Sequence, residues 1–206
     1  MIKLYEFALS GNCHKVRLLL SLLGVPYERV AVDGAAKQHK TATFLAMNPL
    51  GQVPVLVDGD VVLRDSQAIL VYLARRYGGA QALHWLPEEP AALANVIAWL
   101  SVANSEVSRG PAALRLLHKW GRPVPETEAE ALTRQLLDLL ESRLQTSTWL
   151  ASEHLSIADI ALYPYVALAP EGQVELVRFP AICGWLARIE ALDGYVAMPG
   201  ILPQVA

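Results

Sequence analysis

The sequence predicts a small α/β domain followed by an all-helical domain, and two observations carry this prediction. Strand-like and helix-like patterns alternate over the first eighty residues, in the order β-α-β-α-β-β-α. Beyond the stretch "GGAQALHWLPEEP" (78–90), which contains Gly, Pro and acidic residues, we find only helical patterns. We therefore expect domains at residues 1–80 and 90–206, joined by a linker at 81–89.

The first half of the α/β domain is predicted to be a strand, a helix and a second strand. "IKLYEF" (2–7) is typical of a short strand, and "YERVAV" (27–32) alternates as a half-buried strand does. Between them, residues 16–23 have helical spacing and end at Gly24. Such a βαβ unit requires a parallel pair of strands with a right-handed crossover.

The second half adds a poorly periodic helical stretch at about 36–47, a hairpin and a final helix. In "VPVLVDGDVVL" (53–63), two β-rich runs flank "DGD" (58–60), which is a hairpin signal. The motif "RDS" (64–66) begins the final helix, which stops at "GG" (78–79).

The second domain shows four helical patterns, at about 93–119, at 132–140, from 156 and from 180. The third has a well-marked start. In "LSIADI", Ser156 is placed to cap the free amides, and Asp159 is placed to reach back to the amide of Ser156. Leu155 and Ile160 are placed to form a hydrophobic staple across that turn. We expect these residues to serve folding and not chemistry.

Composition excludes several classes of protein. The net charge is −3 and no Lys/Arg cluster appears, so we expect no nucleic-acid partner. No uncharged apolar run reaches the roughly 18 residues of a membrane span, and "MIKLYEF" does not resemble a secretory signal, so we expect a cytoplasmic protein. The two cysteines and five histidines show no metal-ligand spacing, so we expect no metal.

The turn after the first strand, Ser10-Gly11-Asn12-Cys13, is the first segment that points to chemistry. In a thioredoxin-like βαβ unit this turn lies at the start of the first helix. Free backbone amides and the positive end of the helix dipole meet there and favour a thiolate. The alternative is a polar loop in which the serine is only a cap.

"NPLGQVPVL" (48–56) is the second segment, because Pro54 begins a strand in which it cannot donate a hydrogen bond. A cis peptide bond at Pro54 would turn the backbone of Val53 outward, where it could pair with an extended peptide. The alternative is a trans proline on an edge strand.

Two further segments would suit the ends of such a peptide. At the start of a helix, Ser66 offers a hydroxyl and amides to a carboxylate, and Asp65 can bind an ammonium group. "KQHK" (37–40) could bind a second carboxylate. Taken alone, the first pair is indistinguishable from an ordinary helix cap, and the second segment from a solvated surface.

As a set, these segments resemble the glutathione S-transferase superfamily, including its bacterial cytosolic members. The similarity covers "LSGNCHKVRLLLSLLGVPYE", "HKTATFLAMNPLGQVPVLVDGD", "LRDSQAILVYLARRYG" and "LSIADIALYPY". It implies a thioredoxin-like glutathione-binding domain, a helical domain that contributes the electrophile site, and a homodimer. The glutathione-binding positions that it implies are Val53 and Pro54 for the cysteinyl unit, Asp65 and Ser66 for the γ-glutamyl unit, and His39, Lys40 and Gln52 for the glycyl end.

The resemblance also decides between Ser10 and Cys13. Ser10 falls where theta-like and zeta-like members keep a serine, and where omega-like members and glutaredoxins keep a nucleophilic cysteine. Cys13 then falls on the resolving cysteine of C-x-x-C. Because a hydroxyl cannot form a disulfide but can donate a hydrogen bond to a thiolate, we expect Ser10 to be the catalytic residue. The role of Cys13 stays open.

The resulting hypothesis is a glutathione transferase, a family associated with detoxification, in which glutathione as thiolate attacks an electrophile. The alternatives are a glutathione-dependent isomerase, a disulfide reductase or peroxidase, and a non-enzymatic glutathione-binding protein. A second-substrate pocket is expected between the two domains, at Phe7, Leu9, Val107 and Pro111. The sequence does not identify the electrophile.

Overall fold

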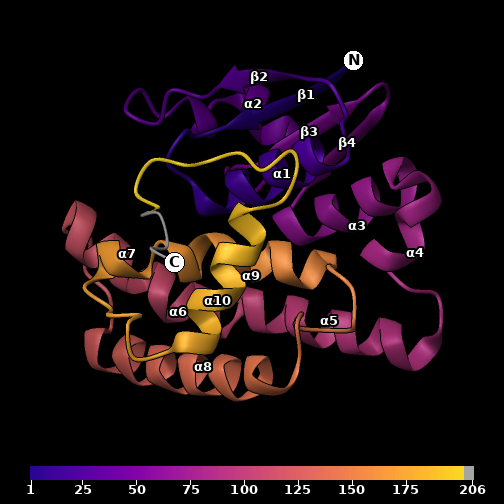
Figure 1. Ribbon diagram of the computed structural model, residues 1–206. Coiled ribbons are helices and arrows are strands. Elements are labelled where there is room, and N and C mark those ends of the chain that lie inside the picture. The colour runs from indigo at the N-terminus through magenta and orange to yellow at the C-terminus, as the bar shows by residue number, and fades with distance from the viewer. Residues whose placement is uncertain (202–206) are drawn as a thin grey trace.

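The computed structural model describes residues 1–201 and shows an α/β part stacked on a helical part (Figure 1). The α/β part contains one four-stranded sheet in the order β2-β1-β3-β4. Its strands are β1 (Ile2–Glu6), β2 (Tyr27–Ala31), β3 (Val55–Asp58) and β4 (Val61–Arg64). β1 pairs with β2 in parallel and with β3 in antiparallel orientation. The predicted βαβ unit and hairpin are thus both present.

Three helices complete this part: α1 (Gly11–Leu22), α2 (Ala42–Met47) and α3 (Ser66–Tyr77). A 3₁₀ turn, Gln38–Lys40, precedes α2. α1 begins five residues before the apolar periodicity predicted, because its polar first turn is set by the Ser10 cap and not by an apolar face.

The segment predicted as a linker is partly helical. A 3₁₀ turn (Gly79–Gln81) and α4 (Ala82–Trp85) follow α3 directly. Trp85 and Leu86 are buried. Their burial explains why this segment is folded and is not a free connection.

The helical part contains α5 (Pro90–Asn104), α6 (Glu106–Arg109), α7 (Pro111–Trp120), α8 (Glu126–Thr146), α9 (Ile157–Ala167) and α10 (Pro180–Glu190). The prediction of one helix from Leu93 to Lys119 is wrong, since that stretch forms α5, α6 and α7. Proline at 111 disfavours helical backbone at Gly110, whose ψ is −106°, and it supplies no amide of its own. The chain therefore turns there and starts α7.

The predicted capping box at the start of α9 is confirmed. Ser156 accepts a hydrogen bond from the amide of Ala158, and Asp159 Oδ2 accepts one from the amide of Ser156 at 3.0 Å. Asp159 Oδ1 also accepts from the amide of Leu150 and from the indole of Trp185, both at 3.0 Å. The Ser156 hydroxyl donates to Oδ2 as well, at 3.2 Å. Asp159 is fully buried, and this burial raises the pKa of its carboxyl although four donors surround it.

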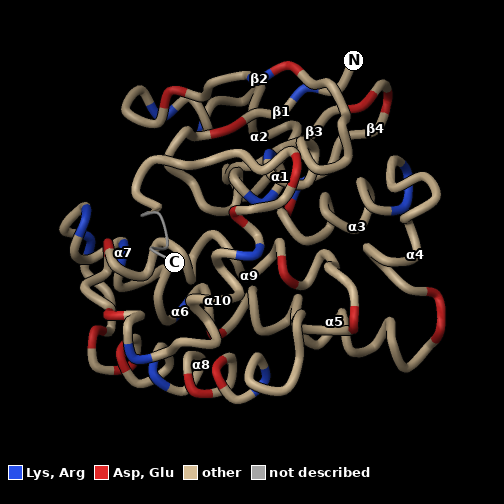
Figure 2. The backbone as a smooth tube through the Cα atoms, in the orientation of Figure 1, with Lys and Arg blue, Asp and Glu red and all other residues tan. Residues whose placement is uncertain are grey.

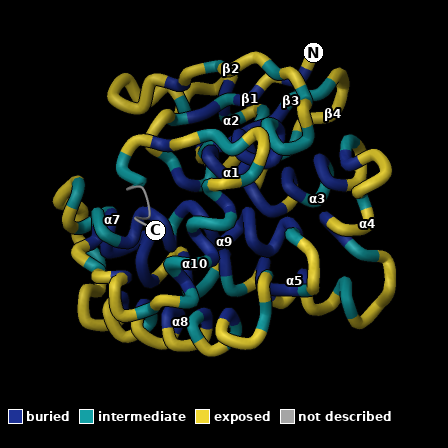
Figure 3. Tube along the Cα trace, viewed as in Figure 1, coloured by how far each residue is buried: buried dark blue, intermediate teal, exposed yellow. Residues whose placement is uncertain are grey.

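One hydrophobic core runs across the boundary between the two parts. Figure 3 shows buried chain concentrated on α1, α3 and α9. Leu19 of α1, Leu70 of α3 and Ile160 of α9 are fully buried members of the same cluster. Because one core holds both parts, the start of α1 has a fixed position relative to the helical part.

The charged residues are mixed in sign. Figure 2 shows Lys/Arg and Asp/Glu residues interspersed along the drawn chain, for example on α8. Within residues 1–201, no helix is long and apolar enough to cross a membrane.

Candidate active site

Ser10 lies at the N-cap position of α1, as expected for a residue that meets a ligand at the helix start. Its Oγ accepts a hydrogen bond from the amide of Cys13 at 3.3 Å. A serine hydroxyl has one proton and two lone pairs, so accepting this bond leaves its proton available for donation. Ser10 is partly exposed. A ligand at the start of α1 can therefore receive a hydrogen bond from it.

Cys13 lies beneath this turn, away from solvent. Its side chain has 0% exposure. Burial raises the pKa of its thiol to about 11, although hydrogen bonds with Ser10 and with the backbone of Phe7 oppose the rise. At neutral pH the group is a protonated, inaccessible thiol. This geometry supports the choice of Ser10 over Cys13.

Two arginines hold the loop that carries Ser10. Arg17 Nη2 of α1 donates to the carbonyl of Ala8 at 3.1 Å. Arg115 Nη1 of α7 donates to the carbonyl of Leu9 at 2.9 Å, and its Nε donates to Glu171 Oε2 at 2.5 Å. The side chain of Arg115 is 3% exposed. Its role could not be read from the sequence, because 106 positions separate it from Leu9.

The Val53–Pro54 peptide bond is cis, as predicted. The turn before it is fixed by buried Asn48, whose Nδ2 donates to the carbonyl of Gln52 at 2.7 Å. Val53 precedes β3, and its side chain is partly exposed. This places its backbone at the margin of the sheet.

The structure brings the three predicted glycyl-end residues close to this turn. Lys40 Nζ donates to the carbonyls of Leu50 and Gly51, at 3.1 and 2.9 Å. A Cβ atom on Gly51 would lie 2.7 Å from the carbonyl oxygen of His39, so the two segments pack closely. The ring of His39 is 5.3 Å from that of Phe7, and Gln52 is exposed.

Asp65 and Ser66 lie at the start of α3, as predicted. Asp65 has a φ of +71°, a backbone conformation that few non-glycine residues adopt. Its Oδ1 accepts from the amides of Gln67 and Ala68, at 2.9 and 3.1 Å. The second carboxylate oxygen, Oδ2, receives no hydrogen bond from residues 1–201. It can therefore accept one from an ammonium group.

Ser66 connects α3 with α1. Its hydroxyl donates to Gln67 Oε1 at 2.6 Å and lies 3.5 Å from Asn12 Oδ1. Asn12 belongs to the first turn of α1, and no sequence motif predicted a separate role for it. The starts of α1 and α3 thus meet, and the Ser10 and Asp65–Ser66 segments border one site.

The residues predicted to line a second-substrate pocket lie in different environments. Phe7 is partly exposed and Leu9 is 37% exposed. Val107 is fully buried in the main core and Pro111 is buried at the start of α7. Of these four residues, Phe7 and Leu9 are accessible to a ligand, whereas Val107 and Pro111 are not. A contribution of the helical part to the pocket stays a prediction.

Within residues 1–201, no group of three or more His, Cys, Asp or Glu residues is arranged to hold a metal ion. The polar groups gathered at the starts of α1 and α3 are hydroxyls, amides and one carboxylate, and Val53 presents its backbone just before β3. Such groups suit an extended, charged peptide. The fold is a thioredoxin-like domain joined to a helical domain.

The chain belongs to the glutathione S-transferase family. The family model for the glutathione S-transferase N-terminal domain matches residues 4–81, and the model for the C-terminal domain matches residues 92–193. The predicted family and the predicted fold class are confirmed.

Relatives in several kingdoms are similar over nearly the whole chain. Glutathione S-transferase theta-1 of Bos taurus is 34% identical, over 95% of this chain and 85% of the relative. The disulfide-bond oxidoreductase YfcG of Escherichia coli (strain K12) is 31% identical, over 93% of this chain and 91% of the relative.

Solved structures agree in fold. A glutathione S-transferase from Pseudomonas fluorescens has a TM-score of 0.87 and 37% identity, covering 96% of this chain and 98% of that one. A glutathione transferase homologue from Drosophila mojavensis, with bound glutathione, has a TM-score of 0.83 and 26% identity, covering 93% and 88%.

Proposed function

We propose that the Ser10 site activates glutathione as a thiolate, which attacks an electrophilic carbon of a small second substrate. The chain works as a cytoplasmic homodimer, the form typical of its family. Glutathione is a co-substrate, and the reaction transfers an alkyl or aryl group to its sulfur. The Ser10 cap on α1 is the observation that carries this proposal, because its hydroxyl lies at the positive end of the helix dipole and can donate to a sulfur there.

The remaining residues of the candidate site bind glutathione in an extended conformation across the α/β part. The backbone of Val53 pairs with the cysteinyl unit beside cis Pro54. Asp65 Oδ2 binds the γ-glutamyl ammonium, and Ser66 binds the neighbouring carboxylate. The glycyl carboxylate lies toward His39, Lys40 and Gln52. This placement brings the sulfur to Ser10.

The chemistry that the residues supply is electrostatic. A free thiol has a pKa of about 8.5, so only a few per cent is thiolate at pH 7. Lowering that pKa by about two units corresponds to roughly 2.7 kcal/mol. A hydrogen bond to a charged acceptor contributes about 1.5–3 kcal/mol, so the Ser10 hydroxyl can supply much of it, and the positive end of the α1 dipole the rest.

A second candidate is glutathione-dependent disulfide reduction, and the similarity to a disulfide-bond oxidoreductase favours it over isomerisation. Cys13 is buried and protonated, so it offers no attacking thiolate at the site. In such a reaction the glutathione thiolate itself would attack one sulfur of the disulfide and release the other as a thiolate. The same Ser10 site serves both reactions.

The decisive experiment compares wild type with Ser10→Ala. We expect the substitution to raise the pKa of the bound thiol by about one to two units and to lower kcat at pH 7 roughly 10- to 100-fold, at nearly unchanged glutathione affinity. Ultraviolet absorbance of the thiolate, titrated with pH, measures the pKa. Ser21→Ala, on the same helix away from the site, is the control. Overlapping titrations of wild type and Ser10→Ala would show that Ser10 is only a cap.

A substrate screen then separates the reactions. Wild type is assayed with glutathione and a chloro-aromatic electrophile, an organic hydroperoxide or a mixed disulfide. We expect conjugation to be the fastest reaction. Turnover of the disulfide alone would favour the second candidate, and glutathione binding without turnover would show a non-enzymatic protein.

A further inference from the structure

A tyrosine of the helical part lies on the first turn of α1. A Cβ atom built on Gly11 would lie 2.8 Å from Cζ of Tyr165 and 3.0 Å from each of its Cε atoms. The hydroxyl-bearing end of the ring therefore rests against the Cα atom of Gly11, directly beside Ser10. A larger residue than glycine at position 11 would push the ring away.

The surroundings of the Tyr165 hydroxyl are rich in donors and positive charge. The amides of Asn12 and Gly11 face its oxygen, and Arg115 adds positive charge from α7. Lys15 Nζ lies 5.5 Å from the centroid of the ring. Burial nevertheless raises the pKa of the Tyr165 phenol, so the hydroxyl keeps its proton at neutral pH.

That proton has no acceptor within the described chain. The two amides are donors and can interact only with the lone pairs of the Tyr165 oxygen. No residue in 1–201 accepts a hydrogen bond from the Tyr165 hydroxyl. The hydroxyl is therefore held in place, with its proton available to a ligand that arrives at the start of α1.

We propose that Tyr165 is a second hydroxyl donor of the reaction site and hydrogen-bonds the glutathione sulfur together with Ser10. This inference rests on the proposed function, because it needs the sulfur to lie at the start of α1. It gives the helical part a direct share in thiol activation. Donors from both parts of the chain then converge on one developing charge.

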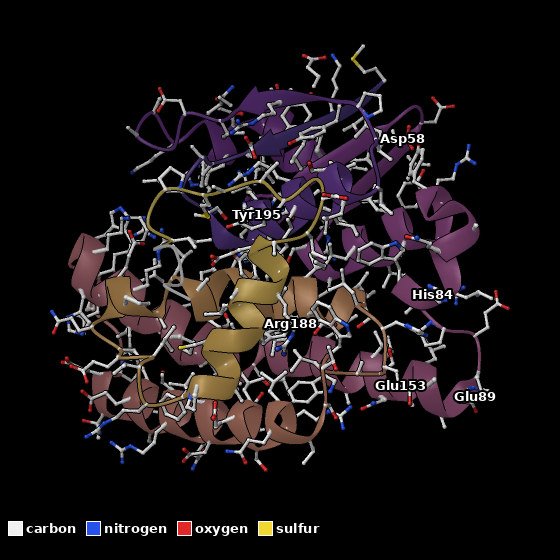
Figure 4. The ribbon with its side chains drawn as sticks, viewed as in Figure 1. Asp58, His84, Glu89, Glu153, Arg188 and Tyr195 are labelled. Carbon is white, nitrogen blue, oxygen red and sulfur yellow. The ribbon has the colours of Figure 1, made fainter. Side chains whose placement is uncertain are left out.

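Tyr165→Phe tests the inference, because it removes one oxygen and keeps the ring on Gly11. We expect the pKa of the bound thiol to rise by about one unit and kcat at pH 7 to fall roughly tenfold, with the glutathione dissociation constant changed less than about twofold. Tyr195→Phe is the matched control. The Tyr195 hydroxyl bonds the Tyr163 hydroxyl at 2.7 Å, and Tyr195 lies on the segment after α10 (Figure 4). The control should keep the wild-type thiol pKa.

Titrating Ser10→Ala in parallel separates the two proposals. A raised thiol pKa in Ser10→Ala with a wild-type value in Tyr165→Phe overturns the role of Tyr165 and leaves the proposed function standing. If the wild-type titration shows no bound glutathione thiolate at pH 7, both the role of Tyr165 and the proposed function are overturned. A lower melting temperature of Tyr165→Phe at an unchanged thiol pKa means a packing role only, which also overturns the inference.

A second variant approaches the same contact from the other side. Gly11→Ala leaves the phenol intact but places a methyl group where the ring lies. If Tyr165 donates to the sulfur, Gly11→Ala raises the thiol pKa in the same direction as Tyr165→Phe. An unchanged pKa in this variant, with the ring displaced, contradicts the inference.

Discussion

The hydroxyl of Ser66 donates to Gln67 Oε1 at 2.6 Å, so its single proton is already engaged. To bind the γ-glutamyl carboxylate, Ser66 must redirect that proton from the neighbouring amide oxygen. The gain from a charged acceptor is therefore partly offset by the loss of a neutral hydrogen bond.

We predict that Ser66→Ala weakens glutathione binding by about 1–2 kcal/mol, a roughly 5- to 30-fold rise in the dissociation constant. The effect on the pKa of the bound thiol should be small, because Ser66 meets the other end of the peptide. Calorimetric titration with glutathione measures the affinity, with Ser21→Ala as the control. Equal affinities for wild type and Ser66→Ala would remove Ser66 from the site.

Cys13 should be unreactive over the physiological pH range. With its pKa raised to about 11, the folded protein holds far less Cys13 thiolate at pH 7 than free cysteine does, and burial blocks the reagent. In a Cys183→Ser background, alkylation by iodoacetamide should be at least about 100-fold slower than that of free cysteine, and should accelerate when the protein unfolds. Rapid alkylation with parallel loss of turnover would instead make Cys13 the reactive group.

Asp159→Ala should strongly destabilise the helical part. The substitution removes a cap, worth about 0.5–2 kcal/mol, and also leaves the buried Leu150 amide and Trp185 indole without an acceptor, at about 1–3 kcal/mol each. We expect a total loss of about 3–5 kcal/mol in the free energy of unfolding by urea. Asp138→Ala, at an exposed position of α8, should change it by less than about 0.5 kcal/mol.

The kinetic constants of folded Asp159→Ala should stay close to those of wild type. Among residues 1–201, its carboxylate accepts hydrogen bonds from Leu150, Ser156 and Trp185, none of which belongs to the start of α1 or α3. A specific loss of turnover at an unchanged melting temperature would contradict this structural assignment.

Lys15 should make stability rise with pH. It is buried, and burial lowers its pKa to about 7, while the Asp65 carboxylate opposes the decrease. The unfolded chain keeps a lysine pKa near 10.4 and so binds more protons between pH 7 and about 10, where stability must increase with pH. Lys15→Met should reduce the rise between pH 7 and 9 by about 2 kcal/mol.

Urea unfolding at both pH values measures this difference. Lys3→Met is the control, because Lys3 lies on the surface and forms an ion pair with the exposed Glu28. Identical pH dependence in wild type and Lys15→Met would show that Lys15 keeps an ordinary pKa in the folded protein.

The α/β part was predictable because its signals are local. Alternation, the "DGD" turn and the Asp65–Ser66 helix start are each read within a few residues, and the structure has all three. The breaks on either side of α6 were missed because apolar spacing continues across them. Gly110 and Pro111 carried a usable signal, since proline disfavours helical backbone in the residue before it.

The candidate site was predictable for the residues within the first eighty positions, because each lies in a short local motif. Long-range partners were not. Arg115 reaches Leu9 and Tyr165 reaches Gly11 only because α7 and α9 fold back onto α1. Burial of Cys13 also follows from tertiary packing, since its neighbours in the sequence are polar.

The hydrogen bond from Arg115 to the carbonyl of Leu9 has a consequence for attempts to re-engineer this protein. Exchange of α5–α10 for the corresponding segment of a relative is an obvious way to change which electrophile is accepted. In this chain such an exchange also replaces the anchor of the loop that carries Ser10, and with it the Glu171 carboxylate that orients the guanidinium. A chimera that retains Arg115 and Glu171 would combine a new electrophile pocket with an unchanged position of Ser10. A chimera that lacks them would change both the electrophile preference and the rate at which bound glutathione reacts. Selection for one of these two properties would therefore also alter the other.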